Sequence, residues 1–230
     1  MRLIKDILFN LGTTSFRLYE WLRVILRYYW REPAFLSIDL LLAAQYLFKS
    51  PHRISKAFLS ARGESNVYQF GETPLTTLDT IARSCHILSH DVVYELGCGS
   101  GRTCFWLRTF VKCRVTGIDY LPAFIKKARH IKKKRCLNQI DFLQKDMLSA
   151  DFSDATVIYL YGTCLEDAFI EKLTFHLGCL KQTSRVITVS YPLTDYCKGT
   201  LFKVTISFSA RFPWGTATVY LNERLKPLVA

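Results

Sequence analysis

The order of apolar and polar positions divides the chain into two parts. In the first 63 residues, apolar residues recur at helical spacing: Ser15–Arg31 carries arginines along a narrow polar stripe, and Pro33–Phe48 is a second, more apolar stretch. Further along the chain, short runs of β-branched and aromatic residues alternate with helical patterns. We therefore expect an N-terminal helical extension over 1–63 and an α/β domain over 64–230.

The second part contains seven runs with the composition of strands. The predicted strands are 92–96, 114–118, 140–144, 156–160, 185–189, 201–210 and 216–222. Helical patterns between the earlier runs predict parallel strands with helices on both faces of the sheet. The last two runs have no helix between them. The expected fold is a Rossmann-like, doubly wound, mostly parallel seven-stranded α/β sheet that ends in an antiparallel β-hairpin.

Charge adds two open interpretations to this picture. The net charge is +12, which suits a polyanionic partner or an anionic membrane surface, and we expect no DNA partner. Lys126–Arg135 holds seven Lys or Arg in ten residues, either as the solvated face of an amphipathic helix or as a footprint for RNA or lipid. The helices of 1–63 either cap the main domain or another subunit, or lie at a membrane interface.

Cysteine spacing bears on location and on metal binding. Eight cysteines form no C-x-x-C pair and no Cys/His cluster, which predicts no metal site and reduced thiols. Pro33–Phe48 contains Asp39 and falls short of the roughly 20 apolar residues that a membrane-spanning helix needs. A cytoplasmic location is predicted, with peripheral attachment to a membrane left open.

The strongest local signal is the segment Tyr-Glu-Leu-Gly-Cys-Gly-Ser-Gly at the end of the first predicted strand. Gly97, Gly99 and Gly101 allow positive φ and let a ligand approach the backbone beside a helix N-terminus. Their spacing, G-x-G-x-G, differs from the dinucleotide fingerprint G-x-G-x-x-G. Glu95 ends a strand predicted to be buried, so it needs a partner, which a cationic amine on the ligand would supply.

This segment resembles the first motif of the class I S-adenosylmethionine-dependent methyltransferases, over roughly Asn66–Asn222. The resemblance implies that the glycine loop wraps the methionine moiety of S-adenosyl-L-methionine, that Asp119 takes both ribose hydroxyls, and that Asp146 accepts the adenine amino group. It implies cofactor contacts from Glu95, Gly97, Gly99, Gly101, Asp119, Tyr120, Asp146 and Met147.

A second resemblance lies upstream. Gly71-Glu72-Thr73 is similar to a loop of the non-SET histone lysine methyltransferases (disruptor of telomeric silencing type), which implies that Glu72 and Thr73 contact the amino-acid end of the cofactor. Thr73-Pro74 also fits a helix N-cap followed by a first-turn proline. The segment Tyr159–Thr163 lacks the Asn-rich motif of that family, so histone-lysine specificity is not implied.

Methyl transfer from a sulfonium is an in-line displacement, for which positioning of the acceptor is sufficient catalysis without a strong acid or base. Tyr161 follows the fourth predicted strand and is the candidate catalytic residue, either orienting an amine or hydroxyl or packing at the sheet edge. No Asn/Asp-Pro-Pro-aromatic motif follows that strand, which argues against methylation of adenine or glutamine nitrogen.

The sequence therefore predicts an S-adenosylmethionine-dependent methyltransferase whose unidentified acceptor is a protein side chain or a small molecule. Two alternatives stay open: an rRNA or tRNA methyltransferase that uses the basic helix, and a catalytically inactive scaffold at a membrane surface. The presence of Glu95, the three glycines, Asp119 and Asp146 together argues against the inactive scaffold.

Overall fold

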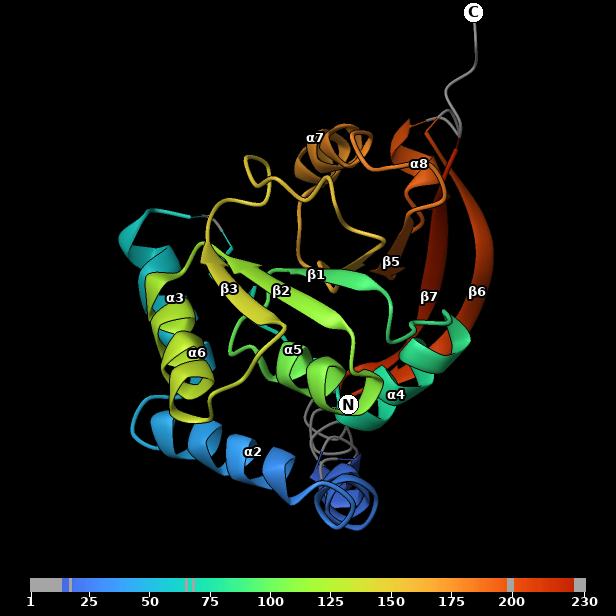
Figure 1. Cartoon of the computed structure of the whole chain (residues 1–230). Coiled ribbons are helices and arrows are strands. Elements are labelled where there is room, and N and C mark those ends of the chain that lie inside the picture. The colour runs from blue at the N-terminus through green and yellow to red at the C-terminus, as the bar shows by residue number, and fades with distance from the viewer. Residues whose placement is uncertain (1–13, 17, 65, 68, 198–200, 226–230) are drawn as a thin grey trace, which may run out of the picture.

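A computed structural model describes the chain over 14–16, 18–64, 66–67, 69–197 and 201–225 (Figure 1). Its centre is one seven-stranded sheet in the order β3-β2-β1-β4-β5-β7-β6. The strands are β1 Val92–Leu96, β2 Arg114–Asp119, β3 Ile140–Gln144, β4 Val157–Leu160, β5 Arg185–Val189, β6 Phe202–Phe212 and β7 Gly215–Arg224. Strands β1 to β5 pair in parallel, and β7 pairs antiparallel with β5 and β6. The predicted fold class, hairpin included, is confirmed.

Helices cover both faces of the sheet because side chains of a buried strand alternate between faces. The helices of the domain are α4 Leu75–Ser84, α5 Arg102–Trp106, η2 Leu107–Val111, α6 Pro122–Lys134, α7 Asp167–Leu177 and α8 Thr194–Cys197. On β4, Val157 and Tyr159 belong to the hydrophobic core shared with α4, α5 and α6, whereas Ile158 and Leu160 belong to the core shared with α7. The sheet is therefore the middle layer of a three-layer sandwich.

The N-terminal helices pack against the helical layer formed by α4, α5 and α6. Residues 18–24 are helical and continue into η1 Ile25–Tyr29, α2 Pro33–Gln45 and α3 Pro51–Ala61. The Tyr28 hydroxyl donates to a carboxylate oxygen of Asp79 on α4 (3.1 Å), and Arg102 on α5 pairs with Asp39 on α2 (2.6 Å). Among the described residues, none of the helices is long and apolar enough to cross a bilayer. The domain boundary at residue 63 stays a prediction.

One local prediction is wrong. Thr73 does not cap α4, which begins at Leu75 with Pro74 in the N-cap position and no side-chain cap. The Thr73 side chain is buried and shares a hydrogen bond of 2.5 Å with the Tyr159 hydroxyl on β4. A tertiary partner 86 residues away thus takes the hydroxyl that a helix N-terminus would have used.

Candidate functional site

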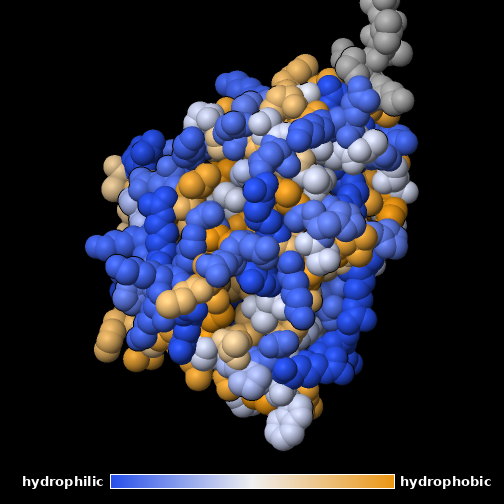
Figure 2. Space-filling view, in the orientation of Figure 1, coloured by the Kyte–Doolittle hydropathy of each residue, from blue (hydrophilic) through white to orange (hydrophobic). Residues whose placement is uncertain are grey.

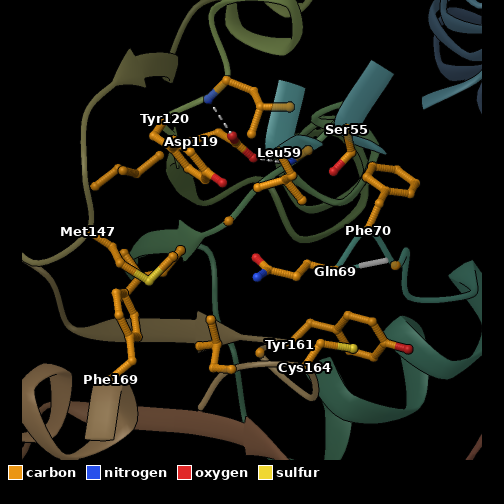
Figure 3. A pocket seen from close by; sticks show the side chains of 18 of the residues that line it. Ser55, Leu59, Gln69, Phe70, Asp119, Tyr120, Met147, Tyr161, Cys164 and Phe169 are labelled. Carbon is orange, nitrogen blue, oxygen red and sulfur yellow. Dashed lines mark hydrogen bonds between the residues drawn. The ribbon is translucent and has the colours of Figure 1, made fainter. Parts of the chain in front are cut away.

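A cavity of about 360 Å³ opens at the carboxyl ends of the central parallel strands (Figure 3). Its walls come from the glycine loop after β1, the end of β2, the loops after β3 and β4, and helix α3 with the segment that follows it. Asp119 and Tyr161 lie on opposite sides of the cavity, and the Gln69 side chain points between them. Ligands of open α/β sheets bind at this edge.

The glycine loop is shaped by close approach of neighbouring rings. Gly99 has φ +51°, and a Cβ placed on it would lie 2.9 Å from Cε2 of Phe70. Gly101 is the N-cap of α5 with φ +81°, and a Cβ there would lie 2.7 Å from Cε1 of Phe142. Both positions therefore require glycine on two grounds, backbone conformation and space.

Asp119, at the end of β2, forms a hydrogen bond to the backbone of the glycine loop. One carboxylate oxygen accepts the Gly99 N–H and the other accepts the Leu121 N–H, both at 2.8 Å. The side chain is only 7% exposed. Burial raises the pKa of Asp119, and the backbone donors lower it in part. Because a carboxylate oxygen has more than one lone pair, these bonds leave acceptor sites toward the cavity.

The remaining predicted contacts of the nucleoside end also line the cavity. Tyr120 stacks edge-to-face against Phe58 of α3, with ring centroids 5.4 Å apart. Asp146 is exposed at the rim, where its carboxylate accepts the Leu148 N–H at 2.9 Å. The Met147 methyl group lies 3.8 Å from where a Gly97 side chain would begin. The cavity residues predicted from the sequence are Gly97, Gly99, Asp119, Tyr120, Asp146, Met147 and Tyr161.

Four predicted contact residues do not line this cavity. The Ser100 hydroxyl donates to a carboxylate oxygen of Glu72, and both residues line a second cavity next to α2. Thr73 is held by Tyr159, as described above, and Gly101 packs against Phe142. The fourth residue, Glu95, lies in the interior of the domain. Gly101 ends the glycine loop that forms the cavity wall, whereas Glu72, Thr73 and Glu95 lie behind this wall.

Glu95 is a buried carboxyl group at the end of β1. Its Oε2 accepts the Cys104 thiol at 2.9 Å, so the partner that its burial demands is a thiol within the chain. Burial raises the pKa of Glu95 from 4.5 to about 8. The carboxyl is therefore largely neutral at physiological pH.

This neutral carboxyl predicts a pH-dependent stability difference. Below pH 4.5 Glu95 is protonated in both the folded and the unfolded chain. Between pH 4.5 and about 8 only the unfolded chain ionises it, so the wild type loses stability as pH rises and levels off above that range. In thermal unfolding scans, Glu95→Gln should gain stability relative to wild type by a few kcal/mol across this window. A difference that stays constant from pH 5 to pH 9 would show that Glu95 is ionised in the native protein.

Tyr161 stands in an aromatic cluster at the far end of the cavity. Its hydroxyl accepts the indole N–H of Trp214 at 2.8 Å, and its ring lies 5.5 Å from the ring of Phe212, centroid to centroid. A Cβ on Gly71 would lie 2.5 Å from the Tyr161 ring, so this wall also needs a glycine. Burial raises the pKa of Tyr161, which keeps the phenol neutral. The residue both lines the cavity and packs at the sheet edge.

Several lining residues had no sequence signal. Leu59 and Ser55 come from the buried face of α3, Gln69 and Phe70 from the segment after it, and Phe169 from α7. Nothing in the local sequence of α3 indicated that its buried face would border the cavity. Among the described residues, no group of three His, Cys, Asp or Glu side chains is placed to hold a metal ion.

Comparison with known proteins identifies the domain. Residues 95–198 match the family model of the ANTKMT methyltransferase domain. The chain carries a class I methyltransferase domain. The RNA methyltransferase of Salinibacter ruber, solved with S-adenosyl-L-homocysteine, superposes on this methyltransferase domain with a TM-score of 0.56 and 26% identity, covering 70% of this chain and 98% of that one. The predicted methyltransferase resemblance is thereby confirmed.

Two further proteins are similar to this chain, one in fold and one in sequence. Magnesium protoporphyrin IX methyltransferase of Synechocystis PCC 6803, solved with bound S-adenosylmethionine, gives a TM-score of 0.57 at 14% identity and covers 76% of this chain and 98% of that one. The sterol 24-C-methyltransferase of Eremothecium gossypii is 32% identical over 101 residues, which is 39% of this chain. The chain spans about a quarter (27%) of the length of that curated relative.

The cavity fits the cofactor with which the neighbouring structures were solved. A carboxylate with free acceptor sites suits ribose hydroxyls at one end, and Tyr120, Met147 and Phe169 offer apolar walls for a planar base. Exposed backbone at Gly97 suits the charged amino-acid moiety. The residues that line the cavity therefore fit the predicted S-adenosylmethionine, which is bound in the Synechocystis neighbour and whose product form is bound in the Salinibacter one.

Proposed function

We propose that the protein transfers a methyl group from S-adenosylmethionine to a protein side chain or a small molecule. The observation that carries this proposal is one continuous cavity with Asp119 and Met147 at one end and Tyr161 at the other. The bound cofactor supplies an electrophilic methyl group, and the chain has to hold an acceptor in line with it. The proteins matched above are named for a sterol, an RNA and a porphyrin as acceptors, so the acceptor class does not transfer by similarity alone.

In this proposal the residues of the first cavity divide by role. Asp119 binds the ribose hydroxyls, Asp146 the adenine amino group, and Met147 and Tyr120 cover the base. Gly97 and Gly99 hold the amino-acid moiety. The residues behind the glycine loop have a positioning role. The Ser100–Glu72 and Thr73–Tyr159 hydrogen bonds hold the segments next to this loop in place. Glu95 and Gly101 pack against Cys104 and Phe142 in the interior of the domain.

Tyr161 is proposed as the residue that meets the acceptor. Because its phenol stays neutral and already accepts the Trp214 indole N–H, it retains its own O–H to donate to an acceptor heteroatom. It thus orients the acceptor and does not remove its proton. The aromatic cluster of Tyr161, Phe212 and Trp214 also suits a methylated cation as product.

An RNA acceptor is the second candidate. Lys126, Lys133 and Lys134 are exposed on α6, and clusters of this kind bind phosphates. The Salinibacter ruber protein, whose name specifies RNA, also matches over most of its length. The first candidate is preferred because the aromatic residues next to Tyr161 lie on the β6–β7 hairpin and not on the basic helix, so no stacking surface accompanies the cations.

The deciding experiment follows the methyl group. The purified full chain, methyl-tritiated S-adenosylmethionine and a cell extract are combined, and the extract is then separated into protein, RNA, lipid and small-molecule fractions. We expect tritium in the protein or small-molecule fraction, and Tyr161→Phe should lower kcat by about tenfold to a hundredfold without weakening cofactor binding. Tritium in RNA would favour the second candidate. Tight cofactor binding without any labelled fraction would favour the inactive scaffold.

The proposed location is a reducing compartment such as the cytoplasm. All eight cysteines lie in the part of the chain that the structure describes; none of them forms a disulfide bond, and five are buried in the domain interior. Peripheral association with a membrane, the other part of the expected location, depends on a separate group of residues in the N-terminal helices.

A further inference from the structure

Exposed apolar side chains are concentrated in the N-terminal helices. Among the described residues, thirteen large apolar side chains are exposed, and four of them lie elsewhere: Leu88, Phe175, Val204 and Trp214. The other nine form what we call the N-terminal apolar face: Leu18, Tyr19, Trp21, Leu22, Leu26, Trp30, Leu40, Leu47 and Phe48. Monomeric proteins rarely expose so many apolar groups in one region unless the region binds something.

Exposure is greatest at positions that packing against the domain leaves free. Leu26 is 76% exposed, Trp30 87% and Phe48 91%. The opposite sides of the same helices are buried, because Tyr28 and Phe35 belong to the hydrophobic core of the domain. These helices therefore bury one side in the protein and present a second apolar side to the surroundings.

Charge near this face is unevenly distributed. Residues 18–63 contain three acidic residues. Glu20 accepts the Thr76 N–H at 3.0 Å, Asp39 is buried in its ion pair with Arg102, and Glu32 is half-buried at the start of α2. By contrast, Arg31 directly follows Trp30 and Lys49 directly follows Phe48, and both cations are exposed. Cations thus adjoin the two most exposed aromatic side chains.

The basic helix α6 adds to the same side of the molecule. The Arg135 guanidinium donates to the Ser37 carbonyl of α2 at 3.3 Å, and Gln45 of α2 donates to the Lys127 carbonyl at 3.4 Å. Figure 1 shows α6 standing next to α2, and in Figure 2 orange apolar groups along the lower left edge adjoin its hydrophilic surface. The Lys127 ammonium also donates to the Gln45 carbonyl, so Arg135 and Lys127 of α6 lie against α2, the helix that carries Leu40 of the apolar face.

The face also contains a groove. A cavity of about 750 Å³ lies between the N-terminal helix and α2, and Trp21, Trp30, Leu36 and Leu40 line it. The Ser100–Glu72 pair described above also lines it. Such a groove accommodates an apolar chain without burying the exposed cations.

We propose that the N-terminal apolar face docks on an anionic phospholipid bilayer. Aromatic and aliphatic side chains interspersed with Arg and Lys are typical of helices that lie in the headgroup region, where acyl chains bury the apolar groups and anionic headgroups attract the cations. A second copy of the chain is a poorer occupant, because two faces of the same positive charge repel each other. The bilayer satisfies both the apolar and the charged part of the face.

The test is co-sedimentation of the full chain with vesicles. The vesicles contain phosphatidylcholine and about 30% phosphatidylserine, which gives them a strongly negative surface. We expect the protein to bind these vesicles, and the bound fraction to decrease as the salt concentration rises from about 50 to about 500 mM. Trp30→Ser with Phe48→Ser should lower the partition coefficient at least about tenfold. The matched control, Leu88→Ser with Phe175→Ser, removes two exposed apolar groups outside the face and should bind as wild type does.

Three results would overturn the proposal. One is equal sedimentation of the Trp30/Phe48 variant and wild type, with circular dichroism showing that both are folded. Another is that the wild type fails to sediment with anionic vesicles at about 50 mM salt, where electrostatic attraction is only weakly screened. The third is a dimer that forms without vesicles and disappears in the Trp30/Phe48 variant. Cofactor affinity, measured on the same variants, should not change, so this test is independent of the proposed methyl transfer.

Discussion

Replacing Asp119 with alanine should weaken S-adenosylmethionine binding about a hundredfold or more. The change removes the proposed acceptor of two ribose hydroxyls, and hydrogen bonds to a charged group contribute about 1.5–3 kcal/mol each. It also leaves the Gly99 and Leu121 N–H groups without their carboxylate partner, so the glycine loop loses its fixed position. Calorimetric titration of both proteins with the cofactor measures the loss.

Two further variants make this result specific. Asp119→Asn retains one carbonyl acceptor and should lie between alanine and wild type. Asp141→Ala removes an exposed acid on the neighbouring strand β3 and should bind the cofactor as wild type does. Wild-type affinity in Asp119→Ala would mean that the cofactor does not use this end of the cavity.

Replacing Gly101 with alanine should lower the free energy of unfolding by about 3 kcal/mol. A left-handed backbone costs a non-glycine residue about 1–2 kcal/mol, and an overpacked interior adds about 1–3 kcal/mol. Both apply here, because φ is +81° and the new Cβ would lie 2.7 Å from the Phe142 ring and 3.4 Å from Cβ of Ala128. Urea unfolding monitored by tryptophan fluorescence gives the value.

Gly63 provides the matched control. It has φ +72°, close to that of Gly101, but no atom lies within 4 Å of where its Cβ would be. Gly63→Ala should therefore cost only the conformational part, about 1 kcal/mol. Equal losses in the two variants would show that Phe142 moves away and that the loop does not depend on this contact.

The strands were predictable because their sequences combine a run of β-branched and aromatic residues with polar or glycine residues at its ends. β1, β3 and β5 occupy the predicted ranges, since β-branched and aromatic runs there are bounded by polar or glycine residues. Asp119 and the glycine loop were predictable for a related reason. Carboxyl ends of neighbouring parallel strands meet at one edge, so residues far apart in sequence were expected to share a site.

What the sequence could not show depends on partners that are distant along the chain. Thr73 has the local surroundings of an N-cap, and only Tyr159 on β4 explains its role. The burial of Glu95 was evident from its strand, but the Cys104 thiol as its partner depends on how α5 sits over β1. Helix α3 likewise gives no local sign that its buried face borders the cavity. In each case tertiary packing, and not local preference, decides the role.

The segment from Gln69 to Thr73 has a consequence for how the two cavities affect each other. Phe70 and Gly71 border the cofactor cavity, whereas the next residue, Glu72, borders the groove near α2 and binds Ser100 of the glycine loop. Adjacent residues of this segment thus form part of the wall of both cavities. A ligand in the groove that shifts this wall changes cofactor affinity, and by thermodynamic reciprocity the cofactor changes affinity in the groove by the same factor.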